Sequence, residues 1–399
     1  MLTPVRRGVT APLGFVAAGV HCGIKAEALD FALVAAETAV AAAALFTTNL
    51  VKAAPVLVSR EHIVRSGGRA RAVVINSGCA NACTGNAGLA AARATAAEAA
   101  AALGGKVEEI LVASTGVIGV ALDPAKTAAG VRRSVAAASR DGHLNAARAI
   151  MTTDREPKEA AVEAIVNGRT FRVGGIAKGA GMIEPNMATM LAVITTDAAV
   201  DPSHLDVSLR KACAETFNAI TIDGDTSTND SVFALASGRS GVTIGSAEAP
   251  IFDVALMQVC RELALAIVRG GEGATRVVSV TVEGAATRDD ARRVAKTIAN
   301  SLLVKTAVHG ADPNWGRILA AAGRAGVAFD PGCATVQIDH VVLFEAGVPR
   351  DERAQEAATC LARPEVAIRL SLGSGAGSAT VHTCDLSAEY VRINGEYRT

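Results

Sequence analysis

Aromatic side chains are scarce in this sequence, and neither sign of charge is in excess. Among 399 residues there are one Trp, two Tyr and nine Phe, so Ala, Val, Leu and Ile must fill the core. Lys+Arg and Asp+Glu each number 39, and no basic run is longer than two residues. Nucleic-acid binding requires clustered basic side chains. The composition therefore predicts no nucleic-acid partner.

The chain also lacks an apolar run of the length that a bilayer requires. Residues 39–51 form an apolar run that is too short and contains polar residues. Arg6 and Arg7 precede an apolar stretch, as in a signal peptide, but Thr10, Pro12 and Gly14 interrupt it. We therefore expect a cytoplasmic protein with no membrane contact.

Cysteine pairs with metal-binding spacing are missing as well. The eight cysteines are scattered without a CxxC pair, and Cys79 and Cys83 have no second pair to complete a tetrahedral site. Free, buried thiols in a reducing compartment are the better interpretation. The cysteines therefore predict no metal site.

Short β-branched runs alternate with Ala-rich helical runs along the chain. Strands are predicted at 72–76 and 110–114, a helix at 88–103, and a hairpin at Asn167-Gly168. A further helix is predicted at 289–304. Without a regular βαβ rhythm, this mixture favours a layered α/β fold in which sheets pack together and helices lie outside. The length predicts two closely packed domains or one large domain.

A glycine-rich approach leads to a hydroxyl at Thr189. Glycines at 174, 175, 179 and 181 precede this Thr, which stands at the mouth of an apolar, strand-like segment. A Thr hydroxyl needs a base, and the α-amino group of Thr189 would be one if the Ala188–Thr189 bond were cut. Taken alone, the pattern also fits a structural Thr at a strand start.

The turn after the strand at 110–114 offers donors for an oxyanion. Thr115 supplies a hydroxyl and Gly116 an unhindered N–H, which acyl transfer can use. An ordinary strand-end turn is the alternative.

Two further polar segments leave alternatives open. The segment 223–230 could bind a metal, but Ala234 stands where a calcium loop needs Glu, so a structured polar loop is favoured. Residues 309–317 surround the sole Trp, Trp315, and fit either a capped turn or a site or subunit contact.

Together these motifs resemble the ornithine acetyltransferase / glutamate N-acetyltransferase family of arginine biosynthesis. The motifs run from about residue 8 to the end of the chain: GVTAPLGFVAAGVHCGIK, NSGCANACTG, STGVIG, MTTD, KGAGMIEPNMATML, DGDTSTND, GEGATR, GADPNWGR and NGEYRT.

The resemblance implies an α/β/β/α sandwich, similar to N-terminal nucleophile hydrolases but with its own topology, and a smaller α/β domain within roughly 240–360. It implies self-cleavage between Ala188 and Thr189 into chains 1–188 and 189–399, assembled as an α₂β₂ heterotetramer. It implies Thr189 as nucleophile and Thr115 and Gly116 as oxyanion hole. The substrate contacts that it implies are Thr152, Lys178, Thr189, Glu272, Asn394 and Thr399.

The implied reaction moves acetyl from N-acetylornithine to glutamate through acetyl-Thr189. This implied reaction requires no metal and no organic cofactor, and acetyl-CoA would enter only as a second donor. Two alternatives remain at this point. One is a self-processing amidohydrolase with water as acceptor, and the other is a non-enzymatic relative that folds but is never cut.

Overall fold

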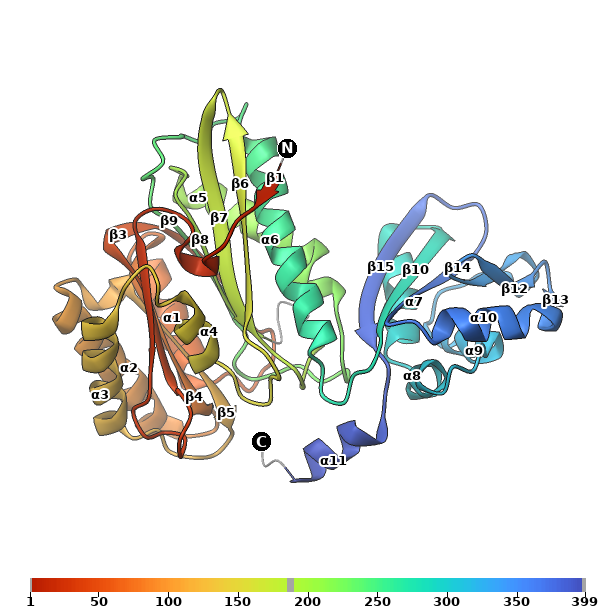
Figure 1. Ribbon diagram of the computed structural model, residues 1–399, viewed down its shortest axis with the longest axis horizontal. Helices are drawn as coiled ribbons and strands as arrows, with labels where there is room; N and C mark the ends of the chain where they lie inside the picture. Colours follow the sequence, from red (N-terminus) through yellow and green to blue (C-terminus); the bar gives the residue numbers. More distant parts are fainter. Residues whose placement is uncertain (1, 185–189, 397–399) are drawn as a thin grey trace. The chain divides into compact units, whose positions relative to one another are not determined.

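The computed structural model describes residues 2–184 and 190–396, which form two compact units. The first unit consists of the described residues up to Asn218 together with Asp225–Ile267 (Figure 1). The second consists of Ala219–Gly224 and the described residues from Val268 onward. The family resemblance implies a smaller domain within roughly 240–360, and the second unit includes 268–360 of that range and continues to the last helix.

A nine-stranded sheet forms the centre of the first unit, in the order β1-β6-β7-β8-β9-β3-β4-β5, with β2 also paired to β3. Its strands are β1 (Leu2–Pro4), β2 (Phe15–Val20), β3 (Phe31–Phe46), β4 (Arg69–Cys79), β5 (Ile110–Val117), β6 (Lys158–Val166), β7 (Arg169–Lys178), β8 (Leu191–Thr196) and β9 (Ser231–Ala236). The predicted hairpin is confirmed: Asn167 and Gly168, both at positive φ, join β6 to β7.

The long strand β3 divides the sheet into two halves. Its first part pairs with β4, and its last part, Ala41–Phe46, pairs with β9. Alternate residues of β3 face opposite ways: Phe31 and Leu33 pack against helices, whereas Ala32 and Val34 join an inner core with side chains from β8 and β9. Both halves of the sheet therefore contribute to one core.

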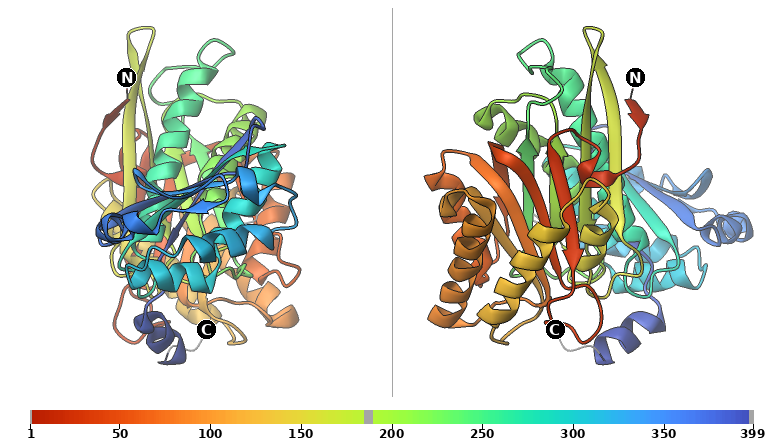
Figure 2. Two further views of the ribbon diagram at one scale, coloured as in Figure 1. Left: turned by 90° about the vertical axis from the view of Figure 1, so that its right-hand side faces the viewer. Right: turned by 60° about the vertical axis from the view of Figure 1, so that its left-hand side comes forward.

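Helices cover the outer faces of this sheet. The helices α1 (Ala54–Arg65), α2 (Gly85–Leu103) and α3 (Pro124–Ala137) pack on β3–β5, where Figure 2 shows orange helices against red and orange strands. The helix α5 (Pro202–Glu215) packs on β3, and α6 (Ala249–Arg269) brings Phe252 against Phe171 of β7. The short helix α4 (His143–Ala149) adds its alanines to the inner core. The predicted layered α/β fold is confirmed.

The second unit is built on a six-stranded sheet with helices against it. The order is β13-β12-β11-β14-β10-β15. The strands are β10 (Val277–Ala285), β11 (Thr335–Ile338), β12 (Val341–Glu345), β13 (Val348–Pro349), β14 (Glu365–Ser371) and β15 (Gly377–Cys384). The helices are α7 (Arg288–Ala299), α8 (Leu302–His309), α9 (Trp315–Gly323), α10 (Ala354–Leu361) and α11 (Ala388–Glu396). Short 3₁₀ helices lie at Gly8–Thr10, Val107–Glu109, Phe217–Ala219, Pro331–Cys333 and Asp351–Arg353.

Two predicted boundaries were wrong. The helix expected at 289–304 is two helices, because the Ser301 side chain accepts the Val304 N–H and starts α8 after a break at Asn300. The strand expected at 110–114 continues to Val117, because β5 keeps pairing with β4 past an irregularity at Cys79. Thr115 and Gly116 therefore belong to the end of a strand.

Candidate active site

Gly116 lies where two parallel strands approach each other closely. Its φ is +126°, and a Cβ added there would lie 2.4 Å from the backbone carbon of Gly78 on β4. Only glycine fits this position, because an L side chain would meet both the dihedral penalty and the neighbouring backbone. The neighbouring Thr115 is nearly buried, with 9% of its surface exposed. The end of β5 thus holds a sheltered hydroxyl next to a backbone with no side chain.

Lys178, the last residue of β7, joins two hydroxyl groups. Its Nζ donates to Thr115 Oγ1 at 3.2 Å and to Thr152 Oγ1 at 3.0 Å. Each hydroxyl accepts this bond through a lone pair, so its own proton is available to another acceptor. The structure therefore brings together three of the residues that the sequence singled out, and it distinguishes Thr152 from Thr153 as the partner of Lys178.

Asp154 fixes the backbone around this cluster, and the sequence analysis missed it. Its carboxylate accepts from Lys158 Nζ at 2.5 Å, from Gly179 N–H at 2.7 Å and from Thr152 N–H at 3.1 Å. Burial alone would raise the pKa of Asp154, but the charges of Lys178 and Lys158 and the hydrogen bonds from Lys158 and Gly179 lower it to about 2. The carboxylate stays ionised and holds both segments that carry Thr152 and Lys178.

Lys25 adds a further cation, also unforeseen. The buried Asp30 accepts backbone N–H groups from residues 22–25, which fixes this loop. Lys25 Nζ then donates to Met151 O at 2.6 Å and to Leu29 O at 3.1 Å. Burial lowers the pKa of Lys25, with the charge of Lys178 acting in the same direction. Lys25, Lys158 and Lys178 carry three positive charges against the carboxylates of Asp30 and Asp154, which leaves a surplus of one positive charge that favours an anion or a developing oxyanion.

Asn229, near the end of the polar segment 223–230, links the ends of β4 and β5 by hydrogen bonds. Asn229 Nδ2 donates to Ala80 O at 2.6 Å and to Ser114 O at 2.8 Å. These bonds attach the residue before Thr115 to the start of β9. Over residues 2–184 and 190–396, no group of three or more His, Cys, Asp or Glu side chains could hold a metal ion.

In the second unit, Glu272 and Asn394 come together. Glu272 is 7% exposed, and its Oε2 accepts from Asn394 Nδ2 of α11 at 2.7 Å. Gly273 allows the approach: its φ is +69°, and an added Cβ would lie 2.5 Å from the Tyr390 nitrogen. Ala188, Thr189 and Thr399 lie outside the residues that the structure describes.

The segment 309–317 has a structural explanation in the same unit. Trp315 stacks on Phe344 with ring centroids 5.0 Å apart and donates to Asp351 Oδ1 at 3.1 Å. Asn314 caps α9 by accepting the Arg317 N–H. A capped helix with a packed indole accounts for these residues.

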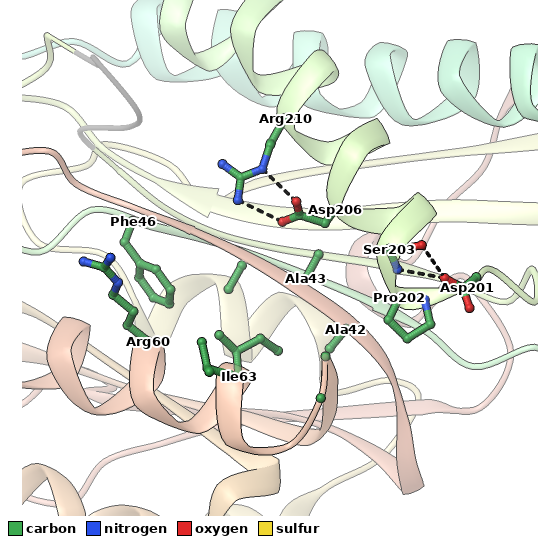
Figure 3. A pocket seen from close by; sticks show the side chains of 14 residues that line it. Ala42, Ala43, Phe46, Arg60, Ile63, Asp201, Pro202, Ser203, Asp206 and Arg210 are labelled. Carbon is green, nitrogen blue, oxygen red and sulfur yellow. Dashed lines mark hydrogen bonds and ion pairs between the residues drawn. The ribbon is translucent and has the colours of Figure 1, made fainter.

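A separate groove of about 620 Å³ lies between α1 and α5 (Figure 3). Ala42, Ala43 and Ile63 form part of its apolar wall, while Arg210 is already paired with Asp206. None of the predicted site residues that the structure describes lines this groove. The groove thus offers an apolar wall and an arginine that is already paired. The hydroxyl–lysine cluster of Thr115, Thr152 and Lys178 is the better candidate site.

No helix within the described ranges is both long and apolar enough to cross a membrane.

Fold and site define a class: a layered α/β protein with a sheltered cluster of hydroxyls and lysines at the ends of β5 and β7 and in the neighbouring loops. The chain belongs to the ArgJ family, whose family model matches residues 16–399.

Known relatives match nearly the whole chain. The protein named "Arginine biosynthesis bifunctional protein ArgJ" from Symbiobacterium thermophilum is 49% identical over 398 residues, covering 98% of each chain. The protein of the same name from Parasynechococcus marenigrum is 48% identical over 396 residues, covering 99% of this chain and 96% of its own. The crystal structure of the ArgJ protein of Bacillus halodurans is 42% identical with a TM-score of 0.51, and it covers 52% of this chain and 100% of its own.

Proposed function

We propose that this chain transfers acetyl from N²-acetyl-L-ornithine to L-glutamate through an acetyl-Thr189 intermediate, after cutting itself between Ala188 and Thr189. The observation that carries the proposal is the contact of Lys178 Nζ with both Thr115 Oγ1 and Thr152 Oγ1. Leu191, two residues after Thr189, is the strand partner of Lys178. The segment that contains Thr189 therefore begins and ends beside this cluster.

The chemistry assigns one task to each group. The Thr189 hydroxyl attacks the acetyl carbonyl, and the free α-amino group of Thr189 takes the hydroxyl proton. The Thr115 hydroxyl and the Gly116 N–H stabilise the oxyanion, with Lys178 bound to the Thr115 oxygen to favour donation of its proton. Ornithine leaves, and the glutamate amine attacks the acetyl ester. Glu272 binds the ammonium group of ornithine. Asn394 and Thr399 bind other polar groups of the substrates.

Two findings support this assignment. Relatives that share about half of the residues are named for arginine biosynthesis and for two functions. The Bacillus halodurans chain is matched completely yet covers 52% of this one, and a chain starting at Thr189 would have 211 of 399 residues, or 53% (399 − 188 = 211). We also propose that the two pieces assemble as an α₂β₂ heterotetramer in the cytoplasm.

Mass spectrometry of the purified protein tests the cleavage. Pieces of 188 and 211 residues are expected, and Thr189→Ala should leave one uncut chain without transferase activity. The two neighbours of this position, Ala188 and Met190, have no hydroxyl group, so T189A has no adjacent substitute nucleophile. Only intact chain in active enzyme would contradict the proposal.

A transfer assay with acetylornithine and glutamate, with and without acetyl-CoA, tests the reaction. Acetylglutamate from acetylornithine supports ornithine acetyltransferase activity, and acetylglutamate from acetyl-CoA would add amino-acid N-acetyltransferase activity. Free acetate in place of acetylglutamate would favour the self-processing amidohydrolase. Double-reciprocal plots of the initial rate against acetylornithine concentration, at several fixed glutamate concentrations, should give parallel lines, because one hydroxyl carries the acetyl group between two amines.

A further inference from the structure

Four arginine side chains line one small cavity of the first unit, called the arginine cavity below, which the proposed acetyl transfer does not use. The cavity has a volume of about 350 Å³. Its described lining residues are Val5, Arg6, Arg7, Ala11, Arg140 and Arg172. Lys and Arg make up 39 of the 399 residues of the chain, whereas four of these six residues are Arg and none of the six is acidic. The lining is therefore far more basic than the chain as a whole.

Three separate segments of the chain bring the four arginines together. Arg6 and Arg7 follow β1, Arg140 lies between α3 and α4, and Arg172 belongs to β7. The buried Thr10 links two of these segments, because its Oγ1 lies 2.6 Å from Arg140 O and 3.1 Å from Arg7 O. Arg7 has a φ of +86°, a left-handed conformation that is costly for a residue with a Cβ and that is often found at binding sites. The backbone of the cavity wall is thus held in place by the fold.

Two of the arginines already have a carboxylate partner. Arg7 Nη1 lies 3.1 Å from Asp141 Oδ1, but 46% and 82% of these side chains are exposed, so the pair is weak. Arg172 Nε and Nη2 both donate to Glu163 Oε2, at 2.9 and 2.8 Å. Asp197 accepts the Arg172 N–H at 2.7 Å, and burial raises the pKa of this carboxyl group. The four guanidinium groups outnumber these three carboxyl groups.

The other two arginines have no carboxylate partner within residues 2–184 and 190–396. The Arg6 side chain forms no ion pair there. Arg140 Nη2 donates to the carbonyl oxygens of Thr10 and Ala11 at 3.3 and 3.4 Å, while its Nε is buried and has no hydrogen-bond partner. The next carboxylate along β6, Glu159, is paired with His143 Nδ1 at 2.7 Å. The arginine cavity therefore contains positive charge and N–H donors that these parts of the protein do not use.

The arginine cavity is separate from the candidate active site. Arg172 precedes Lys178 by six residues on β7 (178 − 172 = 6), which corresponds to about 20 Å along a strand. Thr115, Thr152 and Lys178 are not among the residues that line it. A ligand in this cavity would not occupy the place of the acetyl donor.

We propose that the arginine cavity binds a phosphate group, either as free phosphate or as part of a phosphorylated small molecule. A phosphate dianion has the charge to compensate both Arg6 and Arg140, and its oxygens accept the paired N–H donors of a guanidinium group. Val5 and Ala11 give the cavity an apolar wall, and its volume falls within the range of small-molecule sites. This site does not depend on the proposed acetyl transfer.

Isothermal titration calorimetry of the purified full-length protein, at low salt in a buffer free of phosphate and sulfate, measures this binding. The probes are inorganic phosphate, adenosine monophosphate and succinate. Both phosphate probes should bind saturably, with about one molecule per chain. Equal affinities would identify free phosphate as the ligand, whereas adenosine monophosphate binding about 10-fold more tightly would indicate a phosphorylated molecule. Succinate has two carboxylates in place of a phosphate and should bind at least about 10-fold more weakly.

Three variants locate the binding. Arg6→Gln removes an exposed guanidinium group, so the fold should be kept while phosphate affinity falls about 10-fold or more. Arg140→Lys keeps the charge but loses the planar pair of donors, and it should also weaken binding. The matched control is Arg169→Gln, which changes the net charge by the same amount. Arg169 is exposed on the same strand as Arg172 but outside the cavity, so R169Q should bind as wild type does.

Each result decides the proposal. A lack of saturable binding by both phosphate probes would overturn it, as would R6Q and wild type binding phosphate with equal affinity. A loss in R169Q as large as the loss in R6Q would show that only net charge matters, and the site would then be rejected. Succinate binding as tightly as phosphate would show that the cavity takes dianions in general, which would make the assignment to phosphate wrong.

Discussion

Asp154→Asn removes the buried carboxylate that lies against Lys158 and Lys178, and its cost can be worked out from the structure. Lowering the pKa of Asp154 from 3.8 to about 2 corresponds to about 2 kcal/mol in favour of the ionised form. Removing one partner of a buried pair costs about 3–5 kcal/mol, because the remaining charge is left uncompensated. We therefore expect D154N to lose between about 2 and 5 kcal/mol of the free energy of unfolding.

Urea unfolding followed by far-UV circular dichroism measures this loss. Tryptophan fluorescence would not, since the Trp and both Tyr residues of the sequence come after residue 268, outside the first unit. The matched control is Asp206→Asn: Asp206 and Arg210 have the same i,i+4 spacing as Asp154 and Lys158, but 37% and 53% of their side chains are exposed. That variant should lose less than about 1 kcal/mol.

A double variant tests whether uncompensated lysine charge causes the loss of stability in D154N. Asp154→Asn combined with Lys158→Met removes both members of the pair, so part of the lost stability should return. A loss below about 1 kcal/mol in D154N alone would refute the reasoning, as it would show that the carboxylate does not compensate the two lysines.

The other predictions concern the end of β5 and the effect of acid. Thr115→Val should lower kcat for acetyl transfer about 10²–10³-fold with little change in KM, and should slow self-cleavage; a loss confined to KM would make Thr115 a binding residue. Gly116→Ala should cost about 2–5 kcal/mol in urea unfolding, because the new methyl meets the backbone of Gly78 at positive φ. Since the folded pKa of Asp154 is depressed, its contribution of about 2 kcal/mol is present above pH 4 and should disappear as pH falls through 2, which a pH series of urea titrations would detect.

Sequence patterns predicted much of the fold, and the exceptions have physical causes. The hairpin at 167–168 was predictable because Asn-Gly adopts positive φ readily. β3 was not predicted, because its last part is almost entirely Ala, which has low strand propensity and no alternation of polarity. Pairing with β9, far along the chain, makes it a strand.

The site was predictable only in part, since its members come from separate strands. Thr115 and Gly116 followed from local turn chemistry, whereas Lys178, Thr152 and Glu272 entered through family resemblance. That Lys178 contacts Thr115 could not be inferred from spacing, because β5 and β7 are not neighbours in the sheet order. The only feature of the sequence that could have indicated the role of Asp154 is Lys158, four residues later, with which it forms an ion pair.

The two-sided pairing of β3 has a consequence during synthesis on the ribosome. β9 begins 185 residues after β3 ends (231 − 46 = 185), so at about 5–20 residues per second it emerges about 10–40 s later. In that interval the Ala41–Phe46 edge has backbone donors and acceptors but no native partner, a condition that invites pairing with other chains. The four alanines of this edge have low strand propensity and small side chains. They therefore give another nascent chain little apolar surface to bury, which disfavours wrong pairing before β9 is made.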